Sequence, residues 1–162
     1  MRVLVTGGAG FIGSNFVRYL LENTHDSVHT LDALTYAGSR ENLEEILDHP
    51  RHEFTEGDIR NRELVEELID DVDAVVNFAA ESHVDRSIQS AEPFVSTNVQ
   101  GTQTLLDAAC DADIERFVQI STDEVYGEIE SGDFNEEDPL NPRNPYAATK
   151  ASADLLAESY YT

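Results

Sequence analysis

The amino-acid sequence predicts an α/β protein with a doubly wound parallel sheet in three αβα layers. Short apolar segments alternate with longer segments of helical periodicity about five times along the 162 residues. A glycine-rich turn directly follows the first apolar segment, as in the opening unit of a doubly wound sheet. This alternation implies right-handed crossovers between parallel strands, so we expect about five strands in the chain. A two-layer α+β arrangement is the alternative.

The expected strands are short and rich in β-branched or aromatic residues. The chain opens with "RVLVT", and "DAVVNFAA" is a continuous apolar run typical of a strand buried on both faces. The segment "HEFTEGD" alternates between polar and apolar residues and then turns. We therefore expect strands at residues 2–6, 27–32, 52–58, 73–80 and 116–121.

The expected helices carry apolar residues three and four positions apart. In the first of them, Ile12, Phe16 and Leu20 fall on one face. Asn61 is a candidate N-cap, and Pro93 suits the first position of a helix. We expect helices at residues 11–22, 42–47, 61–70, 93–110 and 146–161, with a loop rich in glycine, proline and acids at 127–145.

The charge of the chain is strongly acidic, with 33 Asp and Glu against 10 Lys and Arg and a net charge of −23. Such a surface repels phosphate backbones, so nucleic acid is not an expected partner. Only one of the ten basic residues is a lysine, a composition typical of a halophilic cytoplasm, where salt screens self-repulsion. A halophilic origin predicts loss of structure below molar salt. Full stability at about 0.1 M salt would contradict it.

The single cysteine, Cys110, lies in an apolar helical run, and we expect a buried, inert thiol there. One cysteine supports neither a disulfide framework nor a cysteine-based metal site, and we expect no metal. No segment has the pattern of a signal peptide or the length of a membrane span. We therefore expect a cytoplasmic protein without membrane contact.

The stretch "VTGGAGFIGS" places Gly7, Gly10 and Gly13 at three-residue spacing between a predicted strand and a predicted helix. This pattern is typical of a Rossmann-type dinucleotide site: one glycine permits the tight turn, one the approach of a pyrophosphate, and one close helix packing. Asp32 ends the second predicted strand, where a carboxylate accepts hydrogen bonds from the adenosine ribose. A carboxylate there also repels a 2′-phosphate, so we expect NAD rather than NADP. A glycine-rich βα turn without a ligand is the structural alternative.

Tyr146 and Lys150 are four residues apart on one predicted helix, so their side chains share a face. A tyrosine normally titrates near 10, and a neighbouring ammonium would lower its pKa enough for it to act as a base. Lys150, the only lysine of the chain, could also hold a ribose hydroxyl of the cofactor. A surface tyrosine and a solvated lysine are the alternative explanation.

The segment "STDEVYG" at 121–127 lies where the fifth predicted strand ends, and parallel sheets bind ligands at that end. Ser121 and Thr122 could bond the reacting hydroxyl and the tyrosine. Asp123 and Glu124 add two adjacent carboxyl groups, whose mutual repulsion separates their pKa values. Elimination of water needs such a pair, one protonated and one ionised, whereas hydride transfer does not. Solvated loop acids are the alternative.

The glycine spacing together with Tyr-x-x-x-Lys resembles the extended short-chain dehydrogenase/reductase family, also called the NAD-dependent epimerase/dehydratase family, over the whole chain. "GDIRN" resembles its adenine-contacting turn and "NFAAESHVDRS" its loop along the cofactor. "STNVQGT" resembles its helix with an inward asparagine, which could instead only tie helix to strand. The resemblance implies that the cofactor-binding residues are Gly7, Gly10, Phe11, Ile12, Gly13, Asp32, Asp58, Ile59, Ala79, Ala80, Ser82, Asn98, Ser121, Tyr146 and Lys150.

Within this family, "STDEVYGE", "AAESHVDRSI" and "LDALTYAGSRENL" resemble the 4,6-dehydratases that act on dTDP-glucose. The resemblance implies that Tyr146 takes the 4-hydroxyl proton while NAD takes hydride from C4. It further implies that Glu124 removes the C5 proton and Asp123 protonates the departing 6-hydroxyl, after which hydride returns to C6. Thr122 and Lys150 complete the implied catalytic set. The implied substrate-binding residues are Ser82, His83, Val84, Asp85, Thr122, Asp123 and Glu124.

Members of this family are about twice as long as 162 residues, and their C-terminal region binds the nucleotide of the substrate. We therefore expect an incomplete NAD-binding domain over 1–162 that lacks the substrate-binding region and is inactive alone. Apolar faces on the helices at 93–110 and 146–161 are consistent with the homodimer common in the family, or with packing on the sheet alone. A related nucleotide-sugar epimerase or decarboxylase, or a non-catalytic NAD-binding remnant, are the alternative functions.

Overall fold

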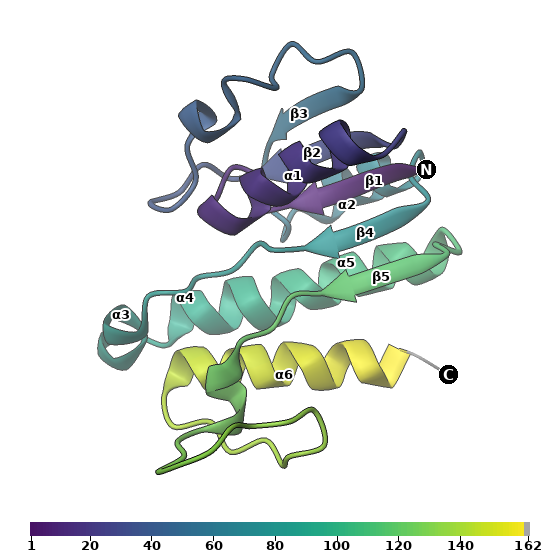
Figure 1. Ribbon diagram of the computed structural model, residues 1–162. Coiled ribbons are helices and arrows are strands. Elements are labelled where there is room, and N and C mark those ends of the chain that lie inside the picture. Colours follow the sequence, from purple (N-terminus) through teal and green to yellow (C-terminus); the bar gives the residue numbers. More distant parts are fainter. Residues whose placement is uncertain (161–162) are drawn as a thin grey trace.

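Five parallel strands form a single sheet in the order β3-β2-β1-β4-β5 (Figure 1). The computed structural model describes residues 1–160. Because β1 is central and the chain steps outward from it twice, the sheet is doubly wound, as predicted. Its topological switch point lies between β1 and β4, where ligands bind at the carboxyl ends of the strands. The strands are β1 (Arg2–Thr6), β2 (Ser27–Asp32), β3 (His52–Glu56), β4 (Ala74–Asn77) and β5 (Arg116–Gln119).

Helices cover both faces of the sheet, which confirms the three-layer prediction. In Figure 1, α1 (Phe11–Asn23) crosses in front of the strands, whereas α2 (Arg62–Ile69) and α5 (Thr102–Asp111) lie behind them. A hydrophobic core lies on each face of the sheet, and alternate strand residues pack into one or the other. Val3 and Val5 belong to the core that contains α1, and Leu4 belongs to the core that contains α2 and α5. The last helix, α6 (Pro145–Tyr160), packs beside α5, where the Tyr160 hydroxyl donates to Asp107.

Two predicted helices differ from the structure. In place of the predicted helix 42–47 there is a 3-10 turn, η1 (Arg40–Leu43), followed by further turns. A segment this short forms too few hydrogen bonds to offset the free energy of helix nucleation. The segment 93–110 is a composite of α4 (Glu92–Phe94), a π-helical stretch η2 (Val95–Gly101) and α5. Within it, the Thr102 hydroxyl donates to the Asn98 carbonyl at 2.7 Å, a side-chain bond of the kind that bends helices.

Several boundaries also shift. β4 covers only four residues of the predicted strand 73–80, and the chain leaves the sheet after it. Two elements were not predicted: α3 (Val84–Gln89) and the 3-10 turn η3 (Asp123–Tyr126). The predicted helix 146–161 corresponds to α6, except that Tyr161 lies outside the described residues.

The prediction of a buried Cys110 is wrong, because this residue at the C-terminal end of α5 faces solvent. Within residues 1–160 no group of three or more His, Cys, Asp or Glu side chains is arranged to hold a metal ion. No helix in this part of the chain is both long and apolar enough to cross a membrane.

Candidate active site

The glycine loop after β1 is shaped so tightly that side chains are excluded. Gly7 has a φ of 67°, and a Cβ built on it would lie 2.6 Å from the Ala79 nitrogen. A Cβ on Gly13 would lie 2.3 Å from the Gly7 oxygen. Both distances are far below van der Waals contact, so this turn requires glycine at the two positions.

The N-terminus of α1 points from this loop into the groove above the sheet. Gly10 is the N-cap, no side chain caps the helix, and its first turn contains no acid. The first N–H groups and the positive end of the helix dipole are therefore available to an anion. This arrangement fits the pyrophosphate of a dinucleotide.

Asp32, at the end of β2, is buried and ties the glycine loop to the neighbouring strand. Its Oδ2 accepts the Ala9 N–H at 2.9 Å, and its Oδ1 accepts the Leu34 N–H at 2.8 Å. A carboxylate has about four acceptor sites, so two remain for the hydroxyls of a ribose. The structure thus gives Asp32 a positioning contact in addition to the predicted ligand contact.

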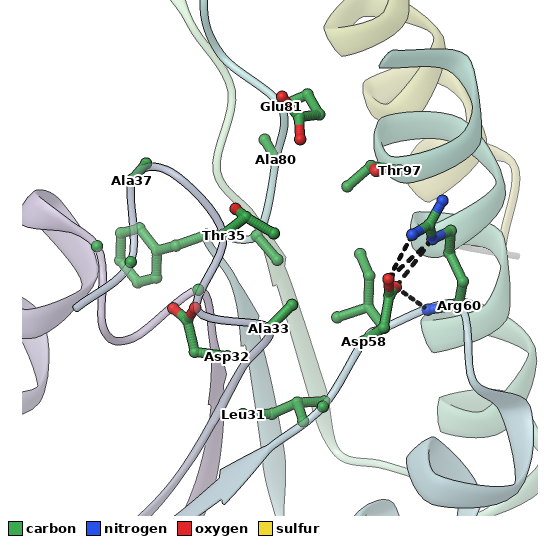
Figure 2. A pocket seen from close by; sticks show the side chains of 17 residues that line it. Leu31, Asp32, Ala33, Thr35, Ala37, Asp58, Arg60, Ala80, Glu81 and Thr97 are labelled. Atoms are coloured by element: carbon green, nitrogen blue, oxygen red, sulfur yellow. Dashed lines mark hydrogen bonds and ion pairs between the residues drawn. The ribbon is translucent and has the colours of Figure 1, made fainter. Parts of the chain in front are cut away.

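Two adjoining pockets form one groove across the carboxyl ends of the strands. The first, drawn in Figure 2, runs from Asp32 past Asp58 to Glu81. The second runs from the glycine loop to Lys150 and shares Gly7 and Gly10 with the first. Apart from Asn98, every predicted cofactor-binding residue lines one of the two pockets: Gly7, Gly10, Phe11, Ile12, Gly13, Asp32, Asp58, Ile59, Ala79, Ala80, Ser82, Ser121, Tyr146 and Lys150.

Asp58 is held by a residue that the sequence analysis did not assign. The Arg60 guanidinium forms several hydrogen bonds to the Asp58 carboxylate, as Figure 2 shows, and its Nη1 donates to the Ser96 hydroxyl at 2.9 Å. These hydrogen bonds keep the pKa of Asp58 below its usual value. The carboxylate is therefore fixed and charged at the far end of the groove.

Asn98 lies behind the groove and is 1% exposed. Its Oδ1 accepts the Glu81 N–H at 2.8 Å, and its Nδ2 donates to the Glu81 carbonyl and to the Thr149 hydroxyl, each at 2.9 Å. These bonds join the loop after β4 to α6 through η2. They support the structural alternative for Asn98, and no described contact brings it to the cofactor pockets.

Tyr146 and Lys150 project from the first two turns of α6 into the groove. Asn144 caps this helix, because its Oδ1 accepts the Ala147 N–H at 2.8 Å. The Ser87 hydroxyl on α3 accepts the Tyr146 N–H at 3.1 Å, and the Tyr146 ring packs edge-on against the buried Phe94. The catalytic helix therefore starts at a fixed position relative to the loop after β4.

The electrostatics of Tyr146 differ from the prediction. Burial raises the pKa of the Tyr146 hydroxyl, the Thr122 hydroxyl opposes this, and the charges of Glu124 and Asp123 raise it further. Lys150 is 4% exposed, and its ammonium donates to the Ile120 carbonyl rather than to the tyrosine. The expectation that Lys150 lowers the pKa of Tyr146 is therefore wrong for the protein without ligands.

The two adjacent acids occupy η3, directly after β5. The Glu124 carboxylate accepts the Asn144 Nδ2 at 2.7 Å, so the cap of α6 also orients this acid. Asp123 is exposed and accepts the Thr122 hydroxyl at 3.3 Å. The Ser121 hydroxyl donates to Asp154 on α6, which leaves Thr122 as the hydroxyl that acts on Tyr146. The sequence analysis assigned no role to Asn144 or Asp154.

The predicted substrate contacts His83, Val84 and Asp85 lie at the start of α3. Next to them, the loop after β2 reaches across the groove: the Tyr36 hydroxyl accepts the Ser82 N–H at 3.1 Å. The Arg86 guanidinium lies over the Tyr36 ring, 4.7 Å from its centroid. Tyr36 and Arg86 were not predicted, because only the fold brings these two loops together.

The fold and the groove define a Rossmann-type α/β protein whose glycine loop and Tyr-x-x-x-Lys helix meet at the topological switch point. The family model described as GDP-mannose 4,6 dehydratase matches residues 4–162. The chain therefore belongs to this family of nucleotide-sugar dehydratases.

Proteins similar to this chain carry related names. The low-salt glycan biosynthesis protein Agl12 of Haloferax volcanii is 78% identical over 160 residues, which is 99% of this chain and 52% of that protein. A dTDP-glucose 4,6-dehydratase of Streptomyces niveus is 53% identical and is covered to 49%. The chain thus spans about half the length of the curated relatives it matches.

Solved structures agree with these relatives. The dTDP-glucose 4,6-dehydratase DesIV of Streptomyces venezuelae, solved with NAD and TYD bound, superposes with a TM-score of 0.96 at 57% identity. The match covers 99% of this chain and 52% of that one. A UDP-glucuronic acid 4-epimerase of Bacillus cereus, in complex with UDP-glucuronic acid and NAD, gives 0.92 at 34% identity, with 99% and 52% coverage.

Proposed function

We propose that this chain is the cofactor-binding and catalytic part of an NAD-dependent nucleotide-sugar 4,6-dehydratase. The full reaction converts dTDP-glucose to dTDP-4-keto-6-deoxyglucose with loss of water. The observation that carries the proposal is the pair Asp123 and Glu124 beside Tyr146, with Glu124 held by Asn144. Oxidation at C4 alone needs only the tyrosine, whereas elimination needs this additional acid and base.

The residues of the groove fit NAD. The first turn of α1 has backbone N–H groups that no side chain caps, and Asp32 keeps acceptor sites for the ribose. A carboxylate at this position disfavours a 2′-phosphate, so NAD is preferred over NADP. When bound, NAD would accept hydride from C4 of the sugar and return it at C6. The proposed cofactor contacts are those that line the two pockets.

The residues at the other end of the groove move the protons. Tyr146 takes the proton of the 4-hydroxyl, for which it must first lose its own proton against the raised pKa of its hydroxyl; the Thr122 hydroxyl, which lowers that pKa, assists this step. The 4-ketone acidifies the C5 proton, which Glu124 removes while Asp123 protonates the departing 6-hydroxyl as water. Glu124 is oriented for this role by Asn144, and Asp123 lies beside Thr122. Lys150 holds the ribose of the cofactor next to Tyr146.

The test is to incubate this 162-residue chain and the complete gene product with dTDP-glucose and NAD in molar salt. We expect the 4-keto-6-deoxy product from the complete protein and none from the 162 residues alone, because this chain spans about half the length of its dTDP-glucose 4,6-dehydratase relatives. Interconversion of UDP-galactose and UDP-glucose without dehydration would instead establish the epimerase alternative. Cofactor binding without turnover of any nucleotide-sugar would establish the non-catalytic alternative.

The double variant Asp123→Asn with Glu124→Gln tests the assigned roles in the complete protein. Loss of the acid and the base should slow elimination by about 10²–10⁴-fold, while oxidation at C4 continues and reduced cofactor accumulates. Glu128→Gln with Glu130→Gln removes the same charge from exposed positions of the following loop and serves as the control. Unchanged elimination in the first variant would show that other groups carry the protons.

Three further properties belong to the proposal. The cytoplasm is the proposed location. The acidic composition and the similarity to a Haloferax protein support a halophilic origin. A homodimer through the faces of α5 and α6 is the proposed assembly. Its test is the molar mass of the complete protein in molar salt.

A further inference from the structure

Lys150 occupies a position that disfavours its charge. The side chain is 4% exposed, and burial lowers the pKa of its ammonium. Its hydrogen-bond acceptor is the Ile120 carbonyl, a neutral group that cannot compensate a full charge. A lysine that is to hold a ribose hydroxyl as a donor must nevertheless stay protonated at neutral pH. Some other group must therefore stabilise the ammonium.

Asp154 lies one turn further along α6, on the same face as Lys150. Its negative charge raises the pKa of Lys150, in opposition to burial. Burial raises the pKa of the half-buried Asp154 carboxyl, and two contacts oppose this: the hydrogen bond that Ser121 donates to its Oδ2 and the charge of Lys150. Asp154 thus connects the end of β5 with the catalytic face of α6.

The other titratable groups of this region act elsewhere. Asp123 and Glu124 on η3 and Tyr36 on the loop after β2 influence the Tyr146 hydroxyl. Among residues 1–160, Asp154 is the one acid with a described electrostatic effect on Lys150. Asp154 also turns the Ser121 hydroxyl toward α6 and so leaves the reacting end of the groove to Thr122.

We propose that Asp154 is a positioning residue of this site, whose carboxylate keeps the buried Lys150 ammonium charged and fixes the orientation of Ser121. It acts through Lys150 and Ser121 and does not touch the substrate. The inference rests on the proposed function only in the role given to Lys150. The protonation of Lys150 itself can be measured without substrate or cofactor.

Lys150 is the only lysine among the 162 residues, so isotope-labelled lysine reports on it directly. We expect its side-chain NMR signal in Asp154→Asn to titrate at lower pH than in the unmodified protein, because the isosteric amide keeps the Ser121 contact but lacks the charge. In the complete gene product, loss of the signal in Lys150→Arg assigns it. Circular dichroism in molar salt confirms that each variant folds.

Two control variants separate charge from hydrogen bonding. Glu158→Gln removes a carboxylate one turn beyond Asp154, at an exposed position, and should leave the titration of Lys150 unchanged. Ser121→Ala removes the hydrogen bond but keeps the charge, and should also leave it unchanged. If Asp154→Asn does not fold, Asp154→Ser gives the same measurement. The proposal would be overturned if Lys150 titrates at the same pH in the folded Asp154 variant as in Glu158→Gln.

Cofactor affinity gives a second measurement. In Asp154→Asn we expect NAD to bind about tenfold more weakly at alkaline pH than at neutral pH, because Lys150 loses its proton earlier. The unmodified protein should bind NAD equally at both pH values. Equal pH dependence in the two proteins would also overturn the proposal. A protein that binds NAD in this way but does not dehydrate any nucleotide-sugar would contradict the proposed function and leave the role of Asp154 intact.

Discussion

At the glycine-loop end of the groove the backbone forms the walls, whereas at the other end the lining includes Ser82, Ser121, Tyr146 and Lys150. Gly7 donates its N–H to the Leu31 carbonyl at 2.8 Å, and the Ala9 N–H binds Asp32. At the other end, Asn144 holds Glu124 and Ser121 binds Asp154. The first end therefore depends on the absence of side chains, and the second on their identity.

The charges differ in the same way. Two backbone N–H groups donate hydrogen bonds to the Asp32 carboxylate, and the Arg60 guanidinium donates to that of Asp58. At the Tyr146 end, the charges of Asp123 and Glu124 act on the Tyr146 hydroxyl, and the charge of Asp154 acts on the buried Lys150. A binding surface gains from fixed, compensated charges, whereas acid–base chemistry requires groups whose protonation can change. We therefore expect steric changes to disrupt the glycine-loop end, and changes of charge to alter the protonation of groups at the Tyr146 end.

The largest effect should come from Gly7→Ala. The methyl group would lie 2.6 Å from the Ala79 nitrogen, and the φ of 67° is unfavourable for alanine. Together, steric overlap and backbone strain should lower the free energy of unfolding by about 2–5 kcal/mol and abolish NAD binding. Denaturation and cofactor titration in molar salt measure both losses.

Gly132→Ala is the matched control, since Gly132 has a φ of 93° but no atom within 4 Å of the added Cβ. It carries the backbone strain alone and should cost about 1–2 kcal/mol without an effect on NAD binding. Equal losses in the two variants would mean that the backbone around the glycine loop moves to accommodate the methyl group. The expected steric sensitivity of this end would then be wrong.

The sequence predicted the sheet well because local signals specify it. All five strands occur where short apolar or alternating segments were predicted to be strands, and Asn61 caps α2 as expected. The π-helical stretch η2 could not be predicted, because it depends on contacts of Asn98 with Glu81 and Thr149, which are distant in the sequence. The helix α3 was missed since its six residues are too few to establish a helical periodicity.

In the candidate site, too, the features set by local sequence were predicted and those set by tertiary contacts were not. The glycine loop and Asp32 follow a fixed spacing, so the sequence located them, and the pocket lining agrees. The direction of the Tyr146 pKa was predicted wrongly because sequence spacing placed Lys150 on the right face but gave no information about burial. Asp154 lies at the same i, i+4 spacing from Lys150 as Lys150 from Tyr146. This spacing was the one signal that could have revealed it.

Neutralising a carboxylate should change the protonation of Tyr146. The Glu124 charge raises the pKa of Tyr146, so Glu124→Gln, which can keep a side-chain hydrogen bond to Asn144, should lower it. The alkaline absorbance titration of the protein, minus that of Tyr146→Phe, isolates this group from the five other tyrosines. Glu128→Gln is the control for net charge. A Tyr146 titration that stays in place or moves to higher pH in Glu124→Gln would contradict the charge dependence of this end.

The smallest effect concerns two histidines of the sheet that lie away from the groove, His29 in the middle of β2 and His52 at the start of β3. Burial lowers the pKa of both, and their Nε2 atoms lie 2.8 Å and 2.9 Å from the hydroxyls of Thr55 and Thr30. A lowered pKa in the folded state means that the unfolded chain binds protons first as the pH falls. Stability should therefore be complete above about pH 6.5 and decline below it, by at most about 1.4 kcal/mol per pH unit and histidine.

Replacing both histidines, His29→Gln with His52→Gln, should remove this acid-dependent loss, because glutamine can keep a hydrogen bond to each hydroxyl but does not titrate. Denaturation midpoints between pH 5 and 7.5 measure it. Acids that become protonated also relieve the self-repulsion of a chain with a net charge of −23, and the difference between variant and parent cancels that contribution. His25→Gln, on the exposed loop before β2, is the control. An equal pH slope in the double variant and the parent would show that protonation of these two histidines does not lower the stability of the fold.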